Sequence, residues 1–343
     1  MKSRPVATTA TIVLLLTITT PVIGAKLKLA GLSKQHHTFL CQVGSYEIFC
    51  VRDGTTDLIY RQDDGADQIS RLGYPSLSRD GRYCAFVKKL GVHDNVVEQA
   101  IWLFDIQTKN STELIQGRLG VWSLSWSPNG KEIAFVRDSE NGNRGLYAIN
   151  IATREIRELV PPETGPDHLK LPPRHYQSLV SWSPDGGEIA LETKEGVVLV
   201  DLATRKMRKL VDGGQSPAWS PDGKLIAYLM DAQHCFTITP SGIENTLVFS
   251  YKKKDSIDYS LLGPIVWAPD MRSLICNREA GMIGDQRQAY LVNLADKSKK
   301  KIFFEPYKVK RRPLKQLGLC EWVLDRLLEN TDFSFEVVGW TAS

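Results

Sequence analysis

The sequence predicts an all-β fold: a β-propeller of seven blades, or alternatively six, each made of four antiparallel strands. Three observations support this prediction. A five-residue turn motif recurs along the chain, an apolar β-rich strand follows each copy, and successive copies lie 49, 56, 37 and 48 residues apart. Periods of this length with four strands apiece are typical of propeller blades. A β-sandwich of unrelated hairpins is the alternative fold.

The turn motif defines the first two strands of each unit. It occurs as WSPNG (126–130), WSPDG (182–186), WSPDG (219–223) and WAPD (267–270). Proline presets φ for a type I turn, Asp or Asn tolerates the next position, and glycine leaves the turn without steric cost. A fifth copy, at residues 76–89, has Leu77 in place of the tryptophan. Each copy therefore predicts a hairpin.

Two more strands follow each hairpin, joined by a short polar turn such as ATR or ADK. The segments that predict these strand pairs are 102–115, 144–160, 196–211, 235–249 and 289–304.

The ends of the chain decide the blade count. Residues 46–72 indicate the last three strands of a blade, with 37–43 as its inner strand. Residues 317–340 indicate three strands of another blade, for which 26–32 supply the outer strand, and this count gives seven blades. If 317–340 instead completes the first blade, the count is six.

Residues 1–25 have the architecture of a signal peptide: Lys2 and Arg4, an apolar core, then small residues. The core from Ala10 to Ile23 has 14 residues, whereas a spanning helix needs about 20. We expect cleavage, a single propeller domain over residues 26–343, no stable membrane span, and export to the periplasm or the cell exterior. An uncleaved anchor is the alternative.

Most of the six cysteines fit the role of buried core thiols. Cys41 and Cys320 are the exception, because each is expected on the inner strand of a terminal blade. A disulfide between them across the ring closure is left open by the sequence.

The repeated hairpins over roughly residues 73–304 resemble the TolB-type β-propeller repeat, which is also found in relatives of dipeptidyl peptidase IV and prolyl oligopeptidase. The resemblance implies a propeller that binds other molecules in the cell envelope. Those peptidases carry their nucleophile in a G-x-S-x-G elbow, and no such motif occurs here, so hydrolase activity is not implied.

The sequence favours a non-catalytic protein without a cofactor. None of its six histidines has the H-x-x-x-H or H-E-x-x-H spacing of a metal site, and the repeat itself explains the aspartates of the turns. The alternative is a lyase or hydrolase that holds a divalent metal at the channel mouth, as oligogalacturonate lyases do. Its candidate ligands are His93, His168 and His175, which are expected in loops.

Insertions and positive charge occur in the same connections. The first-to-second and third-to-fourth strand turns are short, whereas insertions fall at 89–99, 138–145, 161–177, 250–262 and 305–316. All five connections are expected on the face opposite the turns. Loops on a rigid scaffold are free to carry function.

The net charge is +4 for the whole chain and +2 without the leader's Lys2 and Arg4, whereas the last three insertions together carry +5. A locally basic rim favours an acidic partner. The candidate binding residues are Lys252, Lys253, Lys254, Lys310, Arg311 and Arg312. We expect the partner to be an envelope protein or an acidic polymer, and we expect no nucleic acid.

The leader generates the first testable prediction. Protein isolated from cells should begin near Lys26 and be recovered outside the cytoplasm, because the apolar core is too short to anchor the chain. N-terminal sequencing of the purified protein measures this directly. An intact Met1 in a membrane fraction would show that the segment is an anchor.

Overall fold

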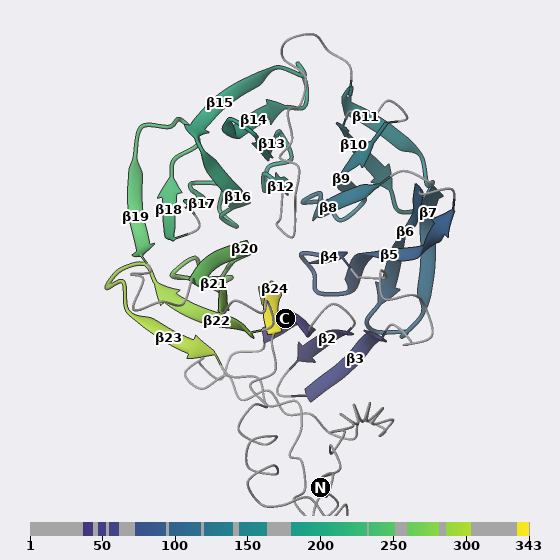
Figure 1. The fold of residues 1–343 in the computed structure, drawn as a ribbon, viewed down its shortest axis with the longest axis horizontal. Coiled ribbons are helices and arrows are strands. Elements are labelled where there is room, and N and C mark those ends of the chain that lie inside the picture. The colour runs from purple at the N-terminus through teal and green to yellow at the C-terminus, as the bar shows by residue number, and fades with distance from the viewer. Residues whose placement is uncertain are drawn as a thin grey trace, which may run out of the picture.

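The computed structural model describes residues 37–43, 47–52, 55–61, 73–93, 96–117, 120–139, 144–162, 180–231, 233–250, 259–280, 286–302 and 335–342. The strands in these ranges form six four-stranded antiparallel sheets arranged around a central axis (Figure 1). The described residues include no helix long and apolar enough to cross a bilayer.

Five of the sheets are each built from four consecutive strands, numbered from the axis outward. The first contains β4 (Gly73–Leu77), β5 (Tyr83–His93), β6 (Val96–Asp105) and β7 (Ser111–Gly117). The second contains β8 (Val121–Trp126), β9 (Glu132–Asp138), β10 (Arg144–Asn150) and β11 (Ile156–Val160). The third contains β12 (Val180–Trp182), β13 (Glu188–Thr193), β14 (Gly196–Asp201) and β15 (Met207–Asp212).

The other two sheets of this kind follow the same order. The fourth contains β16 (Gly214–Trp219), β17 (Ile226–Met230), β18 (His234–Ile238) and β19 (Asn245–Ser250). The fifth contains β20 (Tyr259–Trp267), β21 (Ser273–Ala280), β22 (Gln286–Asn293) and β23 (Lys299–Ile302).

The sixth sheet joins the two ends of the chain and corrects the predicted blade count. Its strands are β24 (Phe335–Ala342), β1 (His37–Val43), β2 (Glu47–Arg52) and β3 (Thr55–Arg61), in the order β24-β1-β2-β3. Because β24 pairs with β1, it supplies the inner strand of this sheet and founds no blade of its own. The prediction of seven blades is therefore wrong, and 37–43 is a second strand, not an inner one.

The turn motif has the predicted geometry in every described copy. In the second blade the Gly130 nitrogen donates to the Ser127 carbonyl oxygen at 3.0 Å, which closes a four-residue turn, and Gly130 has a φ of +68°. The carboxamide oxygen of Asn129 accepts from Ser127 Oγ at 2.8 Å and from the Lys131 nitrogen at 2.9 Å. The same bonds recur around Asp80, Asp185 and Asp222.

The motif tryptophans pack between blades, as their recurrence indicates. Trp126, Trp182 and Trp267 are buried, at 8%, 8% and 6% exposure, whereas Trp219 is partly buried. The indole nitrogen of Trp267 donates to the Ala218 carbonyl oxygen of the preceding blade at 2.9 Å, and that of Trp126 donates to Ser76 in the same way at 3.1 Å. These two indoles thereby link neighbouring inner strands, whereas the indole nitrogen of Trp182 donates to Gly186 in its own blade.

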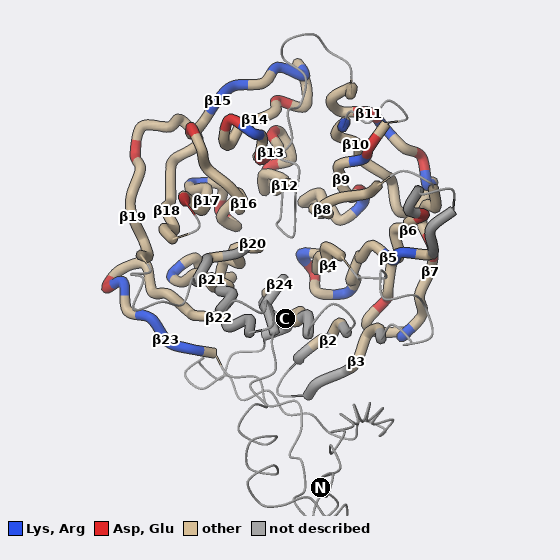
Figure 2. The backbone as a smooth tube through the Cα atoms, in the orientation of Figure 1, with Lys and Arg blue, Asp and Glu red and all other residues tan. Residues whose placement is uncertain are grey.

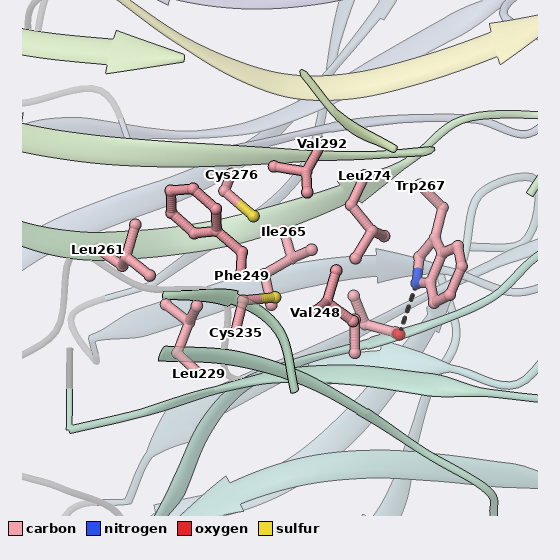
Figure 3. Close-up of a cluster of buried hydrophobic side chains, with 12 residues drawn as sticks. Leu229, Cys235, Val248, Phe249, Leu261, Ile265, Trp267, Leu274, Cys276 and Val292 are labelled. Carbon is pink, nitrogen blue, oxygen red and sulfur yellow. Dashed lines mark hydrogen bonds between the residues drawn. The ribbon is translucent and has the colours of Figure 1, made fainter. Parts of the chain in front are cut away.

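A hydrophobic core lies at each junction between blades. Figure 3 shows the junction of the fourth and fifth blades, where Trp267 and Leu274 of one sheet pack against Leu229 and Phe249 of the other. Two buried thiols, Cys235 and Cys276, lie in this core as apolar side chains.

Serine hydroxyls connect the inner strands around the axis. Ser125 Oγ accepts from the Trp182 nitrogen at 2.9 Å, and Ser181 Oγ accepts from the Trp219 nitrogen at 2.9 Å. An inner strand has one sheet neighbour only, so its other edge presents backbone donors that need a partner. The preceding blade supplies that partner here.

Two further sequence expectations need correction or lie beyond what is described. The insertion at 89–99 is largely strand, since β5 runs to His93 and β6 begins at Val96. Cys41 is on the second strand of its sheet, buried, and forms no disulfide with another described cysteine. Cys320 and the segments 1–25, 26–32 and 317–334 lie outside the described residues, so the disulfide and the signal peptide stay predictions.

The inter-blade indoles give a stability prediction. Trp267→Ala should lower the free energy of unfolding by about 3–5 kcal/mol, because a large buried side chain leaves a cavity at the junction. Trp267→Phe should lower the free energy of unfolding by about 1–3 kcal/mol more than Trp219→Phe does. Loss of the Trp267 indole leaves the Ala218 carbonyl without its donor, whereas Trp219 Nε1 has no partner among the described atoms. Urea unfolding followed by circular dichroism measures all three. Equal losses in the two phenylalanine variants would contradict the role of the indole bond.

Candidate functional site: the face opposite the turns

The two faces of the ring differ in their bonding. The face that carries the SPDG turns (the turn face) has its motif side chains committed to the turns themselves. Hydrogen bonds from Ser183 Oγ and the Gly187 nitrogen hold the pKa of Asp185 below its usual range. Arg79, in the turn of the first consecutive blade, donates to the Pro221 carbonyl oxygen on the opposite side of the ring at 3.4 Å. Thr341 Oγ1 donates to the Arg79 carbonyl oxygen at 2.6 Å.

The opposite face, where the inner strands begin (the long-loop face), carries a cluster of aromatic and charged side chains. We call Tyr74, Trp122, Asp138 and Arg144 the Trp122 cluster. Asp138 Oδ1 accepts from Trp122 Nε1 at 3.1 Å and from Arg144 Nε at 2.8 Å. The Arg144 guanidinium lies 4.8 Å from the centre of the Trp122 ring, and the Tyr74 ring meets that ring edge-on at 6.3 Å.

Strand irregularities position this cluster. The register of β8 shifts between Trp122 and Leu124, and Ser123 between them has a φ of +52°. The register of β4 shifts in the same way after Gly73, and Tyr74 has a φ of +57°. A bulge re-aims the side chains beside it, so Trp122 and Tyr74 leave the regular alternation at the start of two neighbouring inner strands. Gly120 gives the cluster its space, since a Cβ there would collide with Asp138 Oδ2.

The Trp122 cluster combines the features of a recognition surface. Its four residues are partly buried, so they hold their positions and still reach solvent. Tryptophan, tyrosine and arginine are the residues most enriched among those that dominate binding energy. A cation stacked on an aromatic ring contributes about 0.5–2 kcal/mol when it is partly desolvated. The arrangement can therefore bind a partner, and its ion pair keeps the patch electrically balanced.

Sequence reasoning did not select this cluster, although one signal was present. The segment VWSLSW of β8 holds two tryptophans, of which Trp126 occupies the repeat position and Trp122 does not. Because Trp122 lies outside the repeat, packing between blades does not account for it, and its presence indicates a role specific to this blade. Asp138 and Arg144 carry no such signal, because they adopt their roles only when β9 and β10 pair.

The long-loop face also carries a histidine–aspartate pair. His234 Nδ1 lies 2.7 Å from Asp231 Oδ1, at the connection between β17 and β18. Within the ranges given above, no three His, Cys, Asp or Glu side chains gather as metal ligands would. Of the alternative metal ligands, His93 lies at the end of strand β5 and not in a loop, whereas His168 and His175 lie outside the described residues.

The six predicted basic residues are not among the described ones. Lys252, Lys253 and Lys254 follow the end of β19 at Ser250, and Lys310, Arg311 and Arg312 follow the end of β23 at Ile302. The strands that flank both segments end and begin on the long-loop face, because each outer strand runs away from the turn face. The positions of the six side chains stay a prediction.

A buried carboxyl lies in the wall between the third and fourth blades. Glu192 of β13 is 2% exposed, and its Oε2 accepts from the Ser216 nitrogen of inner strand β16 at 2.7 Å. One blade earlier, Ser123 Oγ accepts a hydrogen bond from the Val180 nitrogen at 3.2 Å, so both junctions are linked by a side chain that accepts from an inner-strand backbone nitrogen. Burial raises the pKa of Glu192 to about 7, against the lowering effect of its backbone bond.

Comparisons with known proteins identify sequences that are similar to this chain. No protein family model matches the chain. TolB of the Tol-Pal system from Alcanivorax borkumensis is 34% identical over 80 residues, covering 23% of this chain and 16% of TolB. The uncharacterized peptidase YuxL of Bacillus subtilis is 24% identical over 199 residues, covering 48% of this chain and 30% of YuxL. The chain thus matches less than a third of the length of each of these relatives.

Solved structures agree on the fold. TolB of Acinetobacter baumannii superposes with a TM-score of 0.56 at 14% identity, covering 78% of this chain and 63% of that one. A putative TolB of Agrobacterium tumefaciens gives 0.54 at 13% identity, covering 79% and 90%. The periplasmic gluconolactonase of Pseudomonas aeruginosa gives 0.52 at 15% identity, covering 77% and 82%. Binding proteins and enzymes share this architecture, so the fold alone does not decide between them. The protein described here is a β-propeller that is similar to TolB over 80 residues of sequence and similar in fold to the two TolB structures.

Glu192 makes folding depend on pH. Between its ordinary pKa of 4.5 and about 7 the folded protein keeps a proton that the unfolded chain has lost, so this contribution to stability falls as pH rises through that window. Wild type should therefore lose about 2–3 kcal/mol more unfolding free energy between pH 5 and pH 8 than Glu192→Gln. Urea titrations at both pH values measure the difference. Glu195→Gln, a change at an exposed glutamate of the same blade, is the control and should follow wild type.

Proposed function

We propose that this protein is an exported, non-catalytic binding propeller of the cell envelope, and that it engages a protein or an acidic polymer through its long-loop face. The sixfold ring serves as a rigid scaffold, and the side chains at the ends of its strands make the contacts. The proposal takes the envelope from the TolB-type repeat and from the leader-like N-terminal segment.

The Trp122 cluster is the observation that carries this proposal. It places two aromatic rings at the start of adjacent inner strands and an arginine at the start of β10, and hydrogen bonds at 2.8 Å and 3.1 Å hold Arg144 and Trp122 to Asp138. A preorganised patch of this kind loses little side-chain entropy when a partner binds, which raises affinity for a given contact area.

The turn face is less suited to binding a partner than the long-loop face. Its motif side chains are used in the turns, and Arg79 bonds across the ring axis. The basic segments around Lys252 and Lys310 follow outer strands that end on the other side, and we expect their positive charge there to add attraction for an acidic partner.

Charge reversal tests the proposal. The triple variant Lys310→Glu, Arg311→Glu, Arg312→Glu should keep its melting temperature, because we expect these three charges to be exposed and exposed charges contribute little to stability. Its capture of the natural partner from an envelope extract should fall about tenfold or more, and added salt should weaken capture by wild type in the same way. Quantitative mass spectrometry of the captured material measures both effects.

Two comparisons sharpen this experiment. Lys131→Glu, Lys224→Glu, Arg272→Glu makes an identical change in net charge with three exposed residues of the turn face, and it should leave capture unchanged. Tyr74→Ala removes one ring of the Trp122 cluster and should also reduce capture. Equal loss in the two triple variants would assign the effect to net charge, and full capture by both the long-loop triple variant and Tyr74→Ala would refute binding at the long-loop face.

A further inference from the structure

The outer strands of the six sheets differ in one respect. An outer strand is a sheet edge with unpaired backbone donors and acceptors, and natural proteins protect such edges with charged residues. The outer strands β3, β7, β11, β15 and β23 each contain at least one charged residue, namely Asp57, Glu113, Arg157, Arg208 and Lys299 among others. Strand β19, with the sequence NTLVFS, contains none.

The side chains of β19 present an uncharged, partly apolar surface. Asn245, Thr246 and Leu247 are exposed, the last at 39%, and Ile243 in the preceding turn is 84% exposed. Val248 and Phe249 are buried at 5%, so the strand is anchored to the blade by its second half. In the described part of the chain β19 pairs on one side only, with β18. The edge is therefore uncharged, and among the described residues no second strand pairs with it.

Positive charge borders this edge on both sides (Figure 2). The segment that enters β23 carries Lys297, Lys299, Lys300 and Lys301 against Asp296. Lys299 Nζ lies 5.4 Å from the centre of the Phe249 ring, which places this basic strand directly beside β19.

The other border belongs to the third blade. Arg205 and Lys206 precede β15, and Arg208 and Lys209 lie within it, where they pair with Glu188 at 3.1 Å and with Asp212 at 2.8 Å. Arg208 Nη1 donates to the Pro240 carbonyl oxygen at 2.7 Å, at the turn that leads into β19. The nearest acidic side chain in sequence is Glu244, at the start of the strand.

We propose that β19 is a docking edge for an extended acidic peptide segment of a partner protein, which adds to the fourth blade as a fifth strand. Backbone hydrogen bonds give such pairing its strength, and alternate side chains give it selectivity. An apolar residue of the peptide covers Leu247 and Ile243, and acidic residues on either side reach the lysines of β23 and the pair Arg205 and Lys206 before β15. A second copy of this chain is a poorer occupant, because edge-to-edge pairing brings the same basic borders together.

A defined peptide tests this surface independently of the long-loop face. The probe is a fluorescein-labelled ten-residue peptide in which glutamate alternates with valine and threonine. It should bind the full chain saturably, and Leu247→Glu should weaken binding about tenfold or more, equivalent to about 1.4 kcal/mol. Ile156→Glu is the matched control, since Ile156 is an outer-strand residue of the second blade with 37% exposure, and it should leave affinity unchanged. Fluorescence anisotropy measures the affinities, and thermal melting checks that both variants fold.

Backbone methylation separates strand pairing from charge attraction. Two versions of the peptide carry N-methyl groups on its odd or its even amides, and one of them must lose binding, because one edge of the peptide faces β19. A lysine-for-glutamate version of the peptide should not bind. Absence of saturable binding, full affinity of Leu247→Glu, equal loss in Ile156→Glu, or full affinity of both methylated peptides would each overturn the proposal.

Discussion

The packing of one blade on the next is the interaction on which the rest of the structure depends. No single four-stranded sheet can bury both of its faces, so each sheet needs neighbours on two sides. The motif tryptophans meet this need with a large apolar surface, and two of them, Trp126 and Trp267, also donate to the inner strand of the preceding blade. Serine hydroxyls add a second set of links closer to the axis. These contacts hold the inner strands in place, and they therefore also hold the strand ends on the long-loop face. Side chains at those ends, such as Trp122, are positioned by this packing.

The sequence predicted best those parts of the fold that depend on neighbours within a few residues. The SPDG turns, the strand after each turn and the burial of Trp126, Trp182 and Trp267 follow from local chemistry repeated along the chain. The blade count failed because it depends on β24 choosing β1 as its partner, and no local pattern encodes that choice. His93 was expected in a loop because an insertion was read as irregular, although the β-branched residues around it continue β5 and β6.

The candidate site was predictable only at the level of a face. Loop lengths pointed to the side opposite the turns, and the strand directions agree with that expectation. The particular residues of the Trp122 cluster were not predictable, because two bulges with positive φ at Tyr74 and Ser123 create the arrangement. A bulge leaves no reliable trace in composition. The role of Glu192 was not predictable either. In the sequence EIALET it occupies an ordinary strand position, and its contact with Ser216 arises only when β16 packs beside β13.

Closure of the ring by β24 has a consequence for how the chain is made. The sixth sheet lacks its inner strand until residues 335–342 have been synthesised, since Thr38 pairs with Thr341 far along the chain. The five blades of consecutive strands, by contrast, contain only local pairings and are able to form in order of synthesis. During this interval the edge of β1 is exposed and in need of a partner, as is typical of slow, long-range pairing. Strands β1, β2 and β3 would therefore depend longest on protection from aggregation, and removal of β24 would leave the ring open.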